Sequence, residues 1–352
     1  MTLLEKTLAE AGERALVGHI RSRLPQAAGV RVGAGDDAAA VETGALSLVT
    51  TDCLVEGVHF TRDTAPARLV GRKALAVNLS DVAAMGGIGR YATVSLQLPP
   101  GLRVSWVDSL YDGLLERAAE AGVAIVGGNL ARSRDAIVVD VTLVGDAGRL
   151  MLRSGARAGD RVVVTGTLGA AAEGVRLLGE GARLDEDGAL VATGLWTESS
   201  SAAVLACLRA QLDPRPPFAV ARSIAERGLA HASMDLSDGL STDLLDMCAM
   251  SGVGAVVEAA LLPVDPKAAG LARAGGGDPL ELALHGGEDY QLLLAVAAGE
   301  VSDLRELARV FGSDVTVIGN FVEGEPAVRL HDAAGERPLA PRGNDHFRAL
   351  GS

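Results

Sequence analysis

The sequence lacks several features that common protein classes depend on. Aromatic residues make up only 3% of its 352 residues, so we expect a core built mainly from Ala, Val and Leu. The three cysteines, Cys53, Cys207 and Cys248, form no close pair. This spacing argues against a disulfide scaffold or a zinc site and fits a reducing cytoplasm. No run of about 18 apolar residues is present to span a membrane.

An excess of positive charge is also missing. The net charge of −13 disfavours nucleic acid or an anionic membrane as the main partner. Acidic residues near the start interrupt any apolar signal-peptide core, which again predicts a cytoplasmic protein. The 352 residues exceed one ordinary core, so we predict two domains, 1–148 and 149–352. A stretch rich in Gly, Arg and Asp at 146–160 marks the expected boundary.

Apolar periodicity predicts helices and strands mixed along the chain. Residues 179–198 read as a loop, and so do residues 263–279, which contain three prolines and a Gly-Gly-Gly. Strands are predicted at 45–51, 91–98, 123–126, 136–145, 161–165, 253–258, 291–296 and 315–321, and helices at 3–21, 67–86, 106–121, 170–178, 199–210 and 218–228.

Residues 234–240, Met-Asp-Leu-Ser-Asp-Gly-Leu, form the most informative stretch. Alternation predicts that Asp235 and Ser237 share one face of a strand. Gly239 permits a sharp turn into an amphipathic helix, for which Ser237 or Asp238 is a candidate cap. The stretch therefore suits an ordinary capped turn about as well as it suits a divalent cation, which would need these carboxylates and the hydroxyl to converge.

Four further acidic residues can likewise be explained either by ordinary local structure or by a divalent cation site. Asp36 and Asp37 lie in a glycine-rich loop, Asp52 ends the predicted strand at 45–51, and Asp81 interrupts a buried helix. If these acids converge, two carboxylates about 4 Å apart repel by roughly 4 kcal/mol at an effective dielectric near 20. Oxygen ligands without matching His or Cys favour magnesium, and magnesium clusters commonly bridge phosphates. No Walker A or protein-kinase motif is present.

Eight short motifs, in one order from about residue 15 to the C-terminus, resemble the thiamine-monophosphate kinase family. This family belongs to the superfamily of aminoimidazole ribonucleotide synthetase. The motifs are Gly35-Asp36-Asp37-Ala38, Thr50-Thr51-Asp52, Val58-His59-Phe60, Ala76-Val77-Asn78-Leu79-Ser80-Asp81-Val82-Ala83-Ala84-Met85-Gly86, Gly127-Gly128-Asn129, Arg153-Ser154-Gly155-Ala156, Asp235-Leu236-Ser237-Asp238-Gly239-Leu240 and Gly287-Glu288-Asp289-Tyr290.

The resemblance implies a two-domain α/β fold with mixed sheets, whose N-terminal domains pair as a homodimer barrel. It implies an enzyme that transfers phosphate directly from ATP to thiamine monophosphate, with several Mg²⁺ ions and no catalytic side chain. The implied metal ligands are Asp36, Thr50, Thr51, Asp52, Asp81, Asn129, Asp235 and Asp238; the implied ATP contacts are Tyr111, Gly128, Asn129, Arg153 and Ser237; the implied substrate contacts are His59, Glu288 and Phe347.

Two departures from the family pattern and two alternatives accompany this resemblance. Asn129 stands where many members have a metal-binding Asp, and Asn344 stands near where many carry a stacking aromatic residue, which leaves Phe347 as the candidate. One alternative is an ATP-dependent synthetase of the selenophosphate or aminoimidazole ribonucleotide type. Selenide chemistry would need a reactive Cys, and we interpret the one candidate, Cys53, as a packing residue. The other alternative is a non-catalytic magnesium–nucleotide binding protein.

Overall fold

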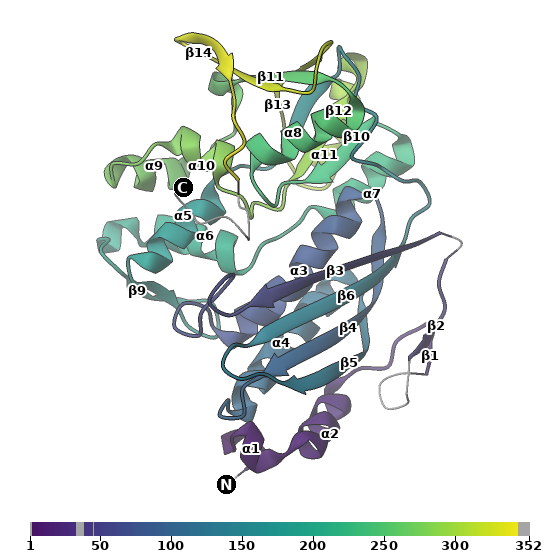
Figure 1. Cartoon of the computed structure of the whole chain (residues 1–352), viewed down its shortest axis with the longest axis vertical. Coiled ribbons are helices and arrows are strands. Elements are labelled where there is room, and N and C mark those ends of the chain that lie inside the picture. The colour runs from purple at the N-terminus through teal and green to yellow at the C-terminus, as the bar shows by residue number, and fades with distance from the viewer. Residues whose placement is uncertain (1, 33–38, 45, 344–352) are drawn as a thin grey trace. The chain divides into compact units, whose positions relative to one another are not determined.

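The computed structural model describes residues 2–32, 39–44 and 46–343 (Figure 1). The chain forms two compact units. The N-terminal unit comprises residues 1–82, 88–147 and 183–191, and the C-terminal unit comprises residues 83–87, 148–182 and 192–352. Within the described ranges, no helix is both long enough and apolar enough to cross a membrane.

The N-terminal unit is built on a mixed sheet of four strands in the order β3-β6-β4-β5. Strands β4 and β5 run parallel, and the other neighbouring pairs run antiparallel. Figure 1 looks onto one face of this sheet, with α3 and α4 behind it. The elements of this unit are η1 (Leu3–Glu5), α1 (Leu8–Ala11), α2 (Glu13–Arg23), β1 (Val30–Val32), β2 (Ala40–Val41), β3 (Ser47–Val55), α3 (Ala67–Ala84), β4 (Ile88–Leu98), α4 (Val104–Ala121), β5 (Ala124–Arg132) and β6 (Val138–Asp146).

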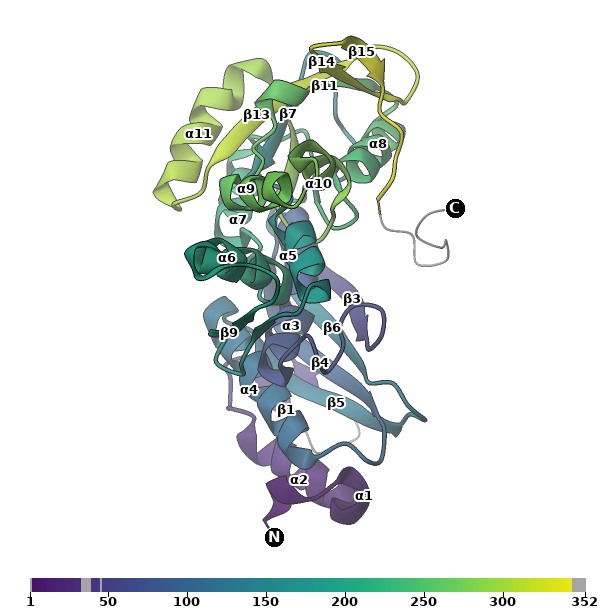
Figure 2. The same ribbon diagram turned by 90° about the vertical axis from the view of Figure 1, so that its left-hand side faces the viewer.

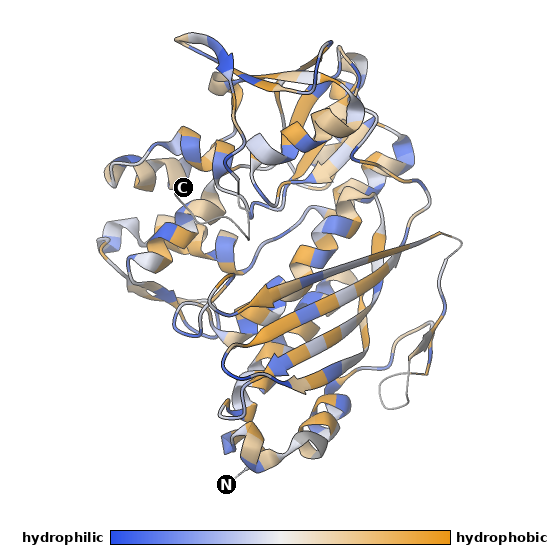
Figure 3. Ribbon diagram, viewed as in Figure 1, coloured by the Kyte–Doolittle hydropathy of each residue, from blue (hydrophilic) through white to orange (hydrophobic). Residues whose placement is uncertain are grey.

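Alternation along β6 gives the sheet two different faces. Val141 and Leu143 are fully buried, while the residues between them are only partly buried. We call the side with Val141 and Leu143 the helix face and the other side the open face. In the register of β3 with β6, Asp52 is opposite Val141 and Thr50 is opposite Leu143, which places both on the helix face. Figure 3 shows these strands as mainly apolar with hydrophilic interruptions.

Helices α3 and α4 cross in backbone contact. A Cβ at Gly71 would lie 2.0 Å from the carbonyl oxygen of Leu110, and one at Gly113 would lie 1.8 Å from that of Arg68. Only glycine allows this approach. The prediction of a long, largely buried helix after residue 67 is confirmed, since α3 runs from Ala67 to Ala84. Close packing on α4 explains why α3 buries so much of its surface.

The C-terminal unit is built on a seven-stranded sheet in the order β10-β12-β7-β13-β11-β14-β15. Val162 and Val164 of β7 pack in one apolar cluster with α8 and α10, and Val163 packs in another with α7 and α11. In Figure 2, α11 and α8 lie on opposite sides of β7 and β13. The sheet is therefore covered by helices on both faces. Because both faces are buried, the sequences of its central strands are continuous apolar runs.

The elements of the C-terminal unit follow the predicted order with several additions. The hairpin of β8 (Ala182–Leu184) and β9 (Leu190–Thr193) carries residues 183–191, which group with the N-terminal unit. The other elements are β7 (Arg161–Thr165), α5 (Ala170–Gly179), η2 (Glu198–Ser200), α6 (Ser201–Leu212), α7 (Phe218–Arg227), β10 (Ala232–Asp235), α8 (Leu240–Ser251), β11 (Gly254–Glu258), η3 (Ala259–Leu261), α9 (Pro266–Ala274), α10 (Pro279–His285), β12 (Leu292–Val296), η4 (Ala298–Glu300), α11 (Val301–Val310), β13 (Val315–Val322), β14 (Val328–Asp332) and β15 (Gly335–Pro338).

The prediction of a loop over residues 263–279 is wrong. Pro266 and Pro279 are the first residues of α9 and α10, preceded by Asp265 and Asp278 as N-caps. Each Asp side chain accepts backbone N–H groups of the first turn. Proline at the first helical position loses no hydrogen bond, so these Asp-Pro pairs begin helices instead of preventing them.

Other predicted elements also differ from the structure. The loop predicted at 179–198 contains the paired strands β8 and β9, and the strand predicted at 45–51 continues to Val55, because β3 pairs with β6 that far. The helix over 3–21 is divided into η1, α1 and α2, and α1 and α2 meet at Gly12, whose φ is 76°. The strand predicted at 123–126 is longer, because β5 pairs with β4 through Gly127 and Gly128 as far as Arg132. Strand β10 ends at Asp235, so Ser237 lies in the following turn and does not share a strand face with Asp235.

Candidate functional site

Two predicted metal ligands meet on the helix face of the N-terminal sheet. The hydroxyl of Thr50, in β3, donates a hydrogen bond of 2.5 Å to Oδ2 of Asp81, in α3. Both side chains are partly buried. Because the hydroxyl proton is directed to the carboxylate, the lone pairs of the Thr50 oxygen point elsewhere and can coordinate a cation. Asp52 follows on the same face, two residues along β3.

Thr51 and Asn129 lie on the open face, opposite Thr50 and Asp52. The Thr51 hydroxyl lies 3.1 Å from Oδ1 of Asp140 in β6. The strand registers place Asp140, Ser95 and Asn129 in one row across β6, β4 and β5. The structure thus divides the predicted ligands of this unit between two faces. Asp140 was missed in the sequence, although a charged residue in an alternating apolar strand was a usable signal.

Cys53 does not pack in the core, which corrects the interpretation made from sequence. Its side chain is exposed on the open face, in the same row as Asp140. Partial burial and the carboxylates of Asp140 and Asp52 raise the pKa of its thiol. A raised pKa lowers the thiolate fraction at neutral pH, so the site does not suit a reactive cysteine.

A second group of acids lies where β10 turns into α8. Asp235 ends the strand and is 2% exposed, and Asp243 of α8 is equally buried. Burial, with the neighbouring charges of Asp238 and Asp235, raises the pKa of Asp243 to about 8. Asp243 was missed in the sequence, where it reads as an ordinary acid in the first turn of a helix.

The cap of α8 also differs from the prediction. Neither Ser237 nor Asp238 caps the helix, because Gly239 is the N-cap residue and makes no side-chain bond. Instead Oδ2 of Asp243 accepts the N–H of Gly239 at 3.0 Å. The first turn of the helix thus fixes the backbone of the turn that carries Ser237 and Asp238, and both of these residues are partly buried.

The Gly-Glu-Asp-Tyr turn is joined to this acidic turn by backbone hydrogen bonds. The N–H of Glu288 donates to the carbonyl of Ser237 at 2.7 Å, and the N–H of Tyr290 donates to that of Leu236 at 2.8 Å. A Cβ at Gly287 would lie 2.8 Å from the carbonyl oxygen of Ser237. The predicted substrate contact Glu288 and the predicted ligand Asp238 therefore lie on adjacent turns.

The turn around Glu288 is strained. Glu288 and Tyr290 have φ values of 57° and 48°, which non-glycine residues rarely adopt. Between them, both carboxylate oxygens of Asp289 accept the N–H of Gly169 at 3.0 Å, at the start of α5. Burial raises the pKa of Asp289 to about 7, although these bonds act in the opposite direction. Strain of this kind persists only where the surroundings fix it, and it is common at functional sites.

The other predicted contacts occupy varied positions. Nδ1 of His59 accepts the N–H of Val55 at 3.0 Å, so the imidazole is oriented by the end of β3. Tyr111 is 4% exposed within the N-terminal unit, and burial raises the pKa of its hydroxyl. Arg153 is exposed. Asp36, Asp37 and Phe347 lie outside the described residues, so their roles stay predictions.

Gly128 has a structural reason to be glycine. A Cβ at this position would lie 2.1 Å from the carbonyl oxygen of Val94, in the neighbouring strand. The close approach of β4 and β5 therefore accounts for the residue without a nucleotide. Its predicted contact with ATP stays a prediction.

The donor chemistry of both acid groups suits Mg²⁺, which takes carboxylate and hydroxyl oxygens. The pKa of Asp243 is raised first by burial and then by the charges of Asp238 and Asp235, and a bound cation would offset the repulsion among these carboxylates. In the described part of either unit, no three His, Cys, Asp or Glu side chains are arranged to hold a metal ion by themselves. Phosphate oxygens and water would have to complete the coordination, as is usual for Mg²⁺.

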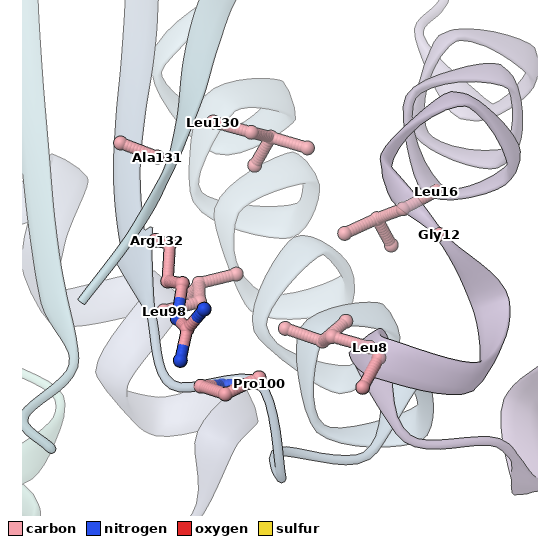
Figure 4. A pocket seen from close by; sticks show the side chains of 9 residues that line it. Leu8, Gly12, Leu16, Leu98, Pro100, Leu130, Ala131 and Arg132 are labelled. Carbon is pink, nitrogen blue, oxygen red and sulfur yellow. The ribbon is translucent and has the colours of Figure 1, made fainter. Parts of the chain in front are cut away.

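A cavity of about 180 Å³ in the N-terminal unit contains none of the predicted site residues (Figure 4). It lies between α1, α2 and the ends of β4 and β5, and its walls are mainly apolar, formed by residues such as Leu8, Leu16, Leu98 and Leu130. Arg132 is the charged residue among those that line it. One cation in an apolar pocket does not suit a substrate that carries several phosphates.

Comparison with known proteins agrees with this geometry. The family model for the N-terminal domain of AIR synthase related proteins matches residues 35–147, and the model for the C-terminal domain matches residues 157–331. The fold and the paired turns thus define a two-domain protein of the AIR synthase related class. The predicted two-domain α/β fold with mixed sheets is confirmed.

Individual relatives define the family within that class. A thiamine-monophosphate kinase of Aquifex aeolicus is 36% identical over 341 residues, which cover 97% of this chain and 99% of the relative. The crystal structure of thiamine-monophosphate kinase from Stenotrophomonas maltophilia K279a matches with a TM-score of 0.77 at 34% identity, over 90% of this chain and 95% of that one. The complex of AaThiL with AMPPCP and TMP matches with a TM-score of 0.75 at 34% identity, over 97% and 99%. The chain belongs to the thiamine-monophosphate kinase family.

Proposed function

We propose that this protein phosphorylates thiamine monophosphate to thiamine diphosphate with ATP, as an enzyme of thiamine diphosphate synthesis. The observation that carries the proposal is the joining of two turns, one with Asp235 and Asp238 and the other with Glu288. An acidic group suited to a phosphate-bound cation thus lies beside a carboxylate suited to an aminopyrimidine and a cationic thiazolium ring. The family to which the chain belongs supports this assignment.

Several Mg²⁺ ions are part of the proposal. In the N-terminal unit Thr50, Asp52 and Asp81 would hold metal, and in the C-terminal unit Asp235 and Asp238 would do so. Bound Mg²⁺ would neutralise the phosphate oxygens of ATP and of the acceptor. Asp243 holds the turn that carries Asp238, and Thr50 is oriented by its bond to Asp81. These residues therefore contribute positioning and charge, and none is proposed as a nucleophile.

We predict that the phosphoryl group passes directly from ATP to the acceptor. The acceptor phosphate is already ionised at neutral pH and needs no strong general base. One in-line displacement should invert a chiral γ-phosphate, which stereochemical analysis of the labelled product would measure. Net retention, or labelled acyl-phosphate trapped on Asp52 or Asp235 with ATP alone, would contradict direct transfer and leave the kinase assignment intact.

A homodimer in solution, formed through the N-terminal sheet, also belongs to the proposal. The open face of that sheet carries Val49, which is 70% exposed, beside Thr51 and Cys53. An exposed apolar residue on an uncovered sheet face is consistent with a protein–protein contact. The mass of the protein in solution, measured by sedimentation, tests this part separately from the activity.

A turnover assay separates this function from its alternatives. ATP consumption should require thiamine monophosphate and produce thiamine diphosphate. A selenophosphate synthetase would need a reactive cysteine. It is disfavoured because the pKa of the Cys53 thiol is raised, which lowers the fraction of the reactive thiolate. Binding of ATP without turnover in the presence of thiamine monophosphate would indicate a nucleotide-binding protein and would refute the proposal.

Replacing Glu288 with Gln is expected to weaken the binding of thiamine monophosphate about tenfold and to leave ATP affinity nearly unchanged. The variant removes a charge from the turn that faces the organic part of the substrate and alters no proposed metal ligand. Calorimetric titration with each ligand separately would measure both affinities. Equal weakening of both ligands would move Glu288 into the nucleotide or metal site.

A further inference from the structure

Two helices that pack on each other, α5 and α6, both bond to the Glu288–Asp289 turn. The N-terminus of α5 binds the Asp289 carboxylate through the N–H of Gly169. From α6, Nε2 of Gln211 donates a hydrogen bond of 2.6 Å to Oε2 of Glu288. Neighbouring residues of one strained turn are thus fixed by neighbouring helices, one through a backbone amide and the other through a side chain.

The packing of α5 on α6 explains how Gln211 reaches this position. A Cβ at Gly174 of α5 would lie 2.3 Å from the carbonyl oxygen of Cys207 and 2.9 Å from Cβ of Gln211. Without that Cβ, α6 approaches closely and Gln211 is 4% exposed. The side chain is therefore seated by backbone packing, and its amide has one fixed direction, toward Glu288.

A buried glutamine at position 211 lowers the stability of the fold relative to an apolar residue. Its Oε1 is buried and has no hydrogen-bond partner among the described residues. A buried acceptor without a partner destabilises a protein, and an apolar residue of the same shape would avoid this cost. The side-chain amide of Gln211 donates one hydrogen bond, to Glu288. We therefore expect Gln211 to act on the orientation of Glu288 and not to stabilise the fold.

We propose that Gln211 is a positioning residue that fixes the Glu288 carboxylate for recognition of the substrate. This inference rests on the proposed function, in which Glu288 binds the aminopyrimidine and cationic thiazolium part of thiamine monophosphate. The N–H of Gln211 occupies Oε2 and so sets the rotation of the carboxylate. The carboxylate is then held in one orientation relative to the N–H donor or cationic ring of the ligand.

Replacing Gln211 with Leu tests this role. KM for thiamine monophosphate should rise about tenfold, because the ordered carboxylate is lost in the ground state and the transition state alike. For the same reason kcat and KM for ATP should stay within about twofold. Tm should be no lower than that of the wild type, since the variant also removes the unpartnered Oε1. Gln211→Glu keeps the shape but places a second carboxylate beside Glu288, and it should raise KM for thiamine monophosphate further.

Gln291→Leu is the matched control. Oε1 of Gln291 accepts a hydrogen bond of 2.9 Å from the Thr165 hydroxyl, so this glutamine has a structural partner close to the same turn. Its loss should lower Tm and leave KM for thiamine monophosphate within about twofold. An unchanged KM in Gln211→Leu, or a fall in Tm with a parallel rise in both KM values, would overturn the inference. A wild-type protein without turnover of thiamine monophosphate would instead refute the proposed function.

Discussion

Asp235→Asn is expected to lower kcat by at least about a hundredfold, and Asp52→Asn should do the same. Each substitution removes one negative charge from a proposed magnesium site and keeps the shape of the side chain. The loss falls mainly on the transition state, where the cations stabilise the transferring phosphoryl group. Steady-state kinetics at saturating Mg²⁺ would measure it. A variant that keeps more than about a tenth of wild-type activity has lost under about 1.4 kcal/mol, and its assigned role would be wrong.

Stability measurements separate this loss from damage to the fold. Asp235 is 2% exposed and lies close enough to Asp243 to help raise the pKa of that carboxyl. A neutral amide at position 235 relieves this repulsion, so without metal the Tm of Asp235→Asn should equal or exceed that of the wild type. Thermal unfolding with and without Mg²⁺ would show it. The wild type should gain more stability from Mg²⁺ than the variant, because the ion binds only the folded site.

Sequence patterns predicted those helices and strands whose structure is determined by the local sequence. The buried helix with Asp81 was predicted because a long apolar run determines an element. The strand at 45–51 was found too, but its end was not, because pairing with β6 extends β3 past Asp52 to Val55. Asp265-Pro266 and Asp278-Pro279 were misread as loop because proline both ends helices and begins them. A proline that follows an N-cap residue begins a helix, and Asp265 and Asp278 are these N-cap residues.

The site was predictable only in part, because most of its geometry depends on contacts distant in sequence. The motifs indicated Asp235, Asp238 and Glu288, but not that the two turns are joined through the carbonyl of Ser237. Gln211 lies 77 residues from Glu288 and has no local signal, since a glutamine near the end of a helix is ordinary. Asp243 likewise looks like any first-turn acid until its bond to Gly239 is seen. Such residues are found from packing and not from periodicity.

Gly239→Ala is expected to lower kcat/KM at least about tenfold and to destabilise the C-terminal unit by about 3 kcal/mol. Gly239 has φ 111° and ψ 144°, a conformation that residues with a Cβ rarely adopt. An added Cβ would also lie 3.0 Å from the carbonyl carbon of His285 and 3.2 Å from the nitrogen of Gly287. The methyl group would therefore press on the segment that leads to Glu288, and it would disturb the turn that carries Asp238.

Gly252→Ala at the other end of α8 is the matched control for this prediction. Gly252 has φ 69° and no heavy atom within 4 Å of an added Cβ, so alanine meets backbone strain alone. It should cost about 1 kcal/mol and leave kcat/KM unchanged. Denaturant unfolding and steady-state kinetics on both variants measure the two effects side by side. If Gly239→Ala lost only stability, to the same extent as Gly252→Ala and with normal kinetics, the joining of the two turns would have no part in holding the site.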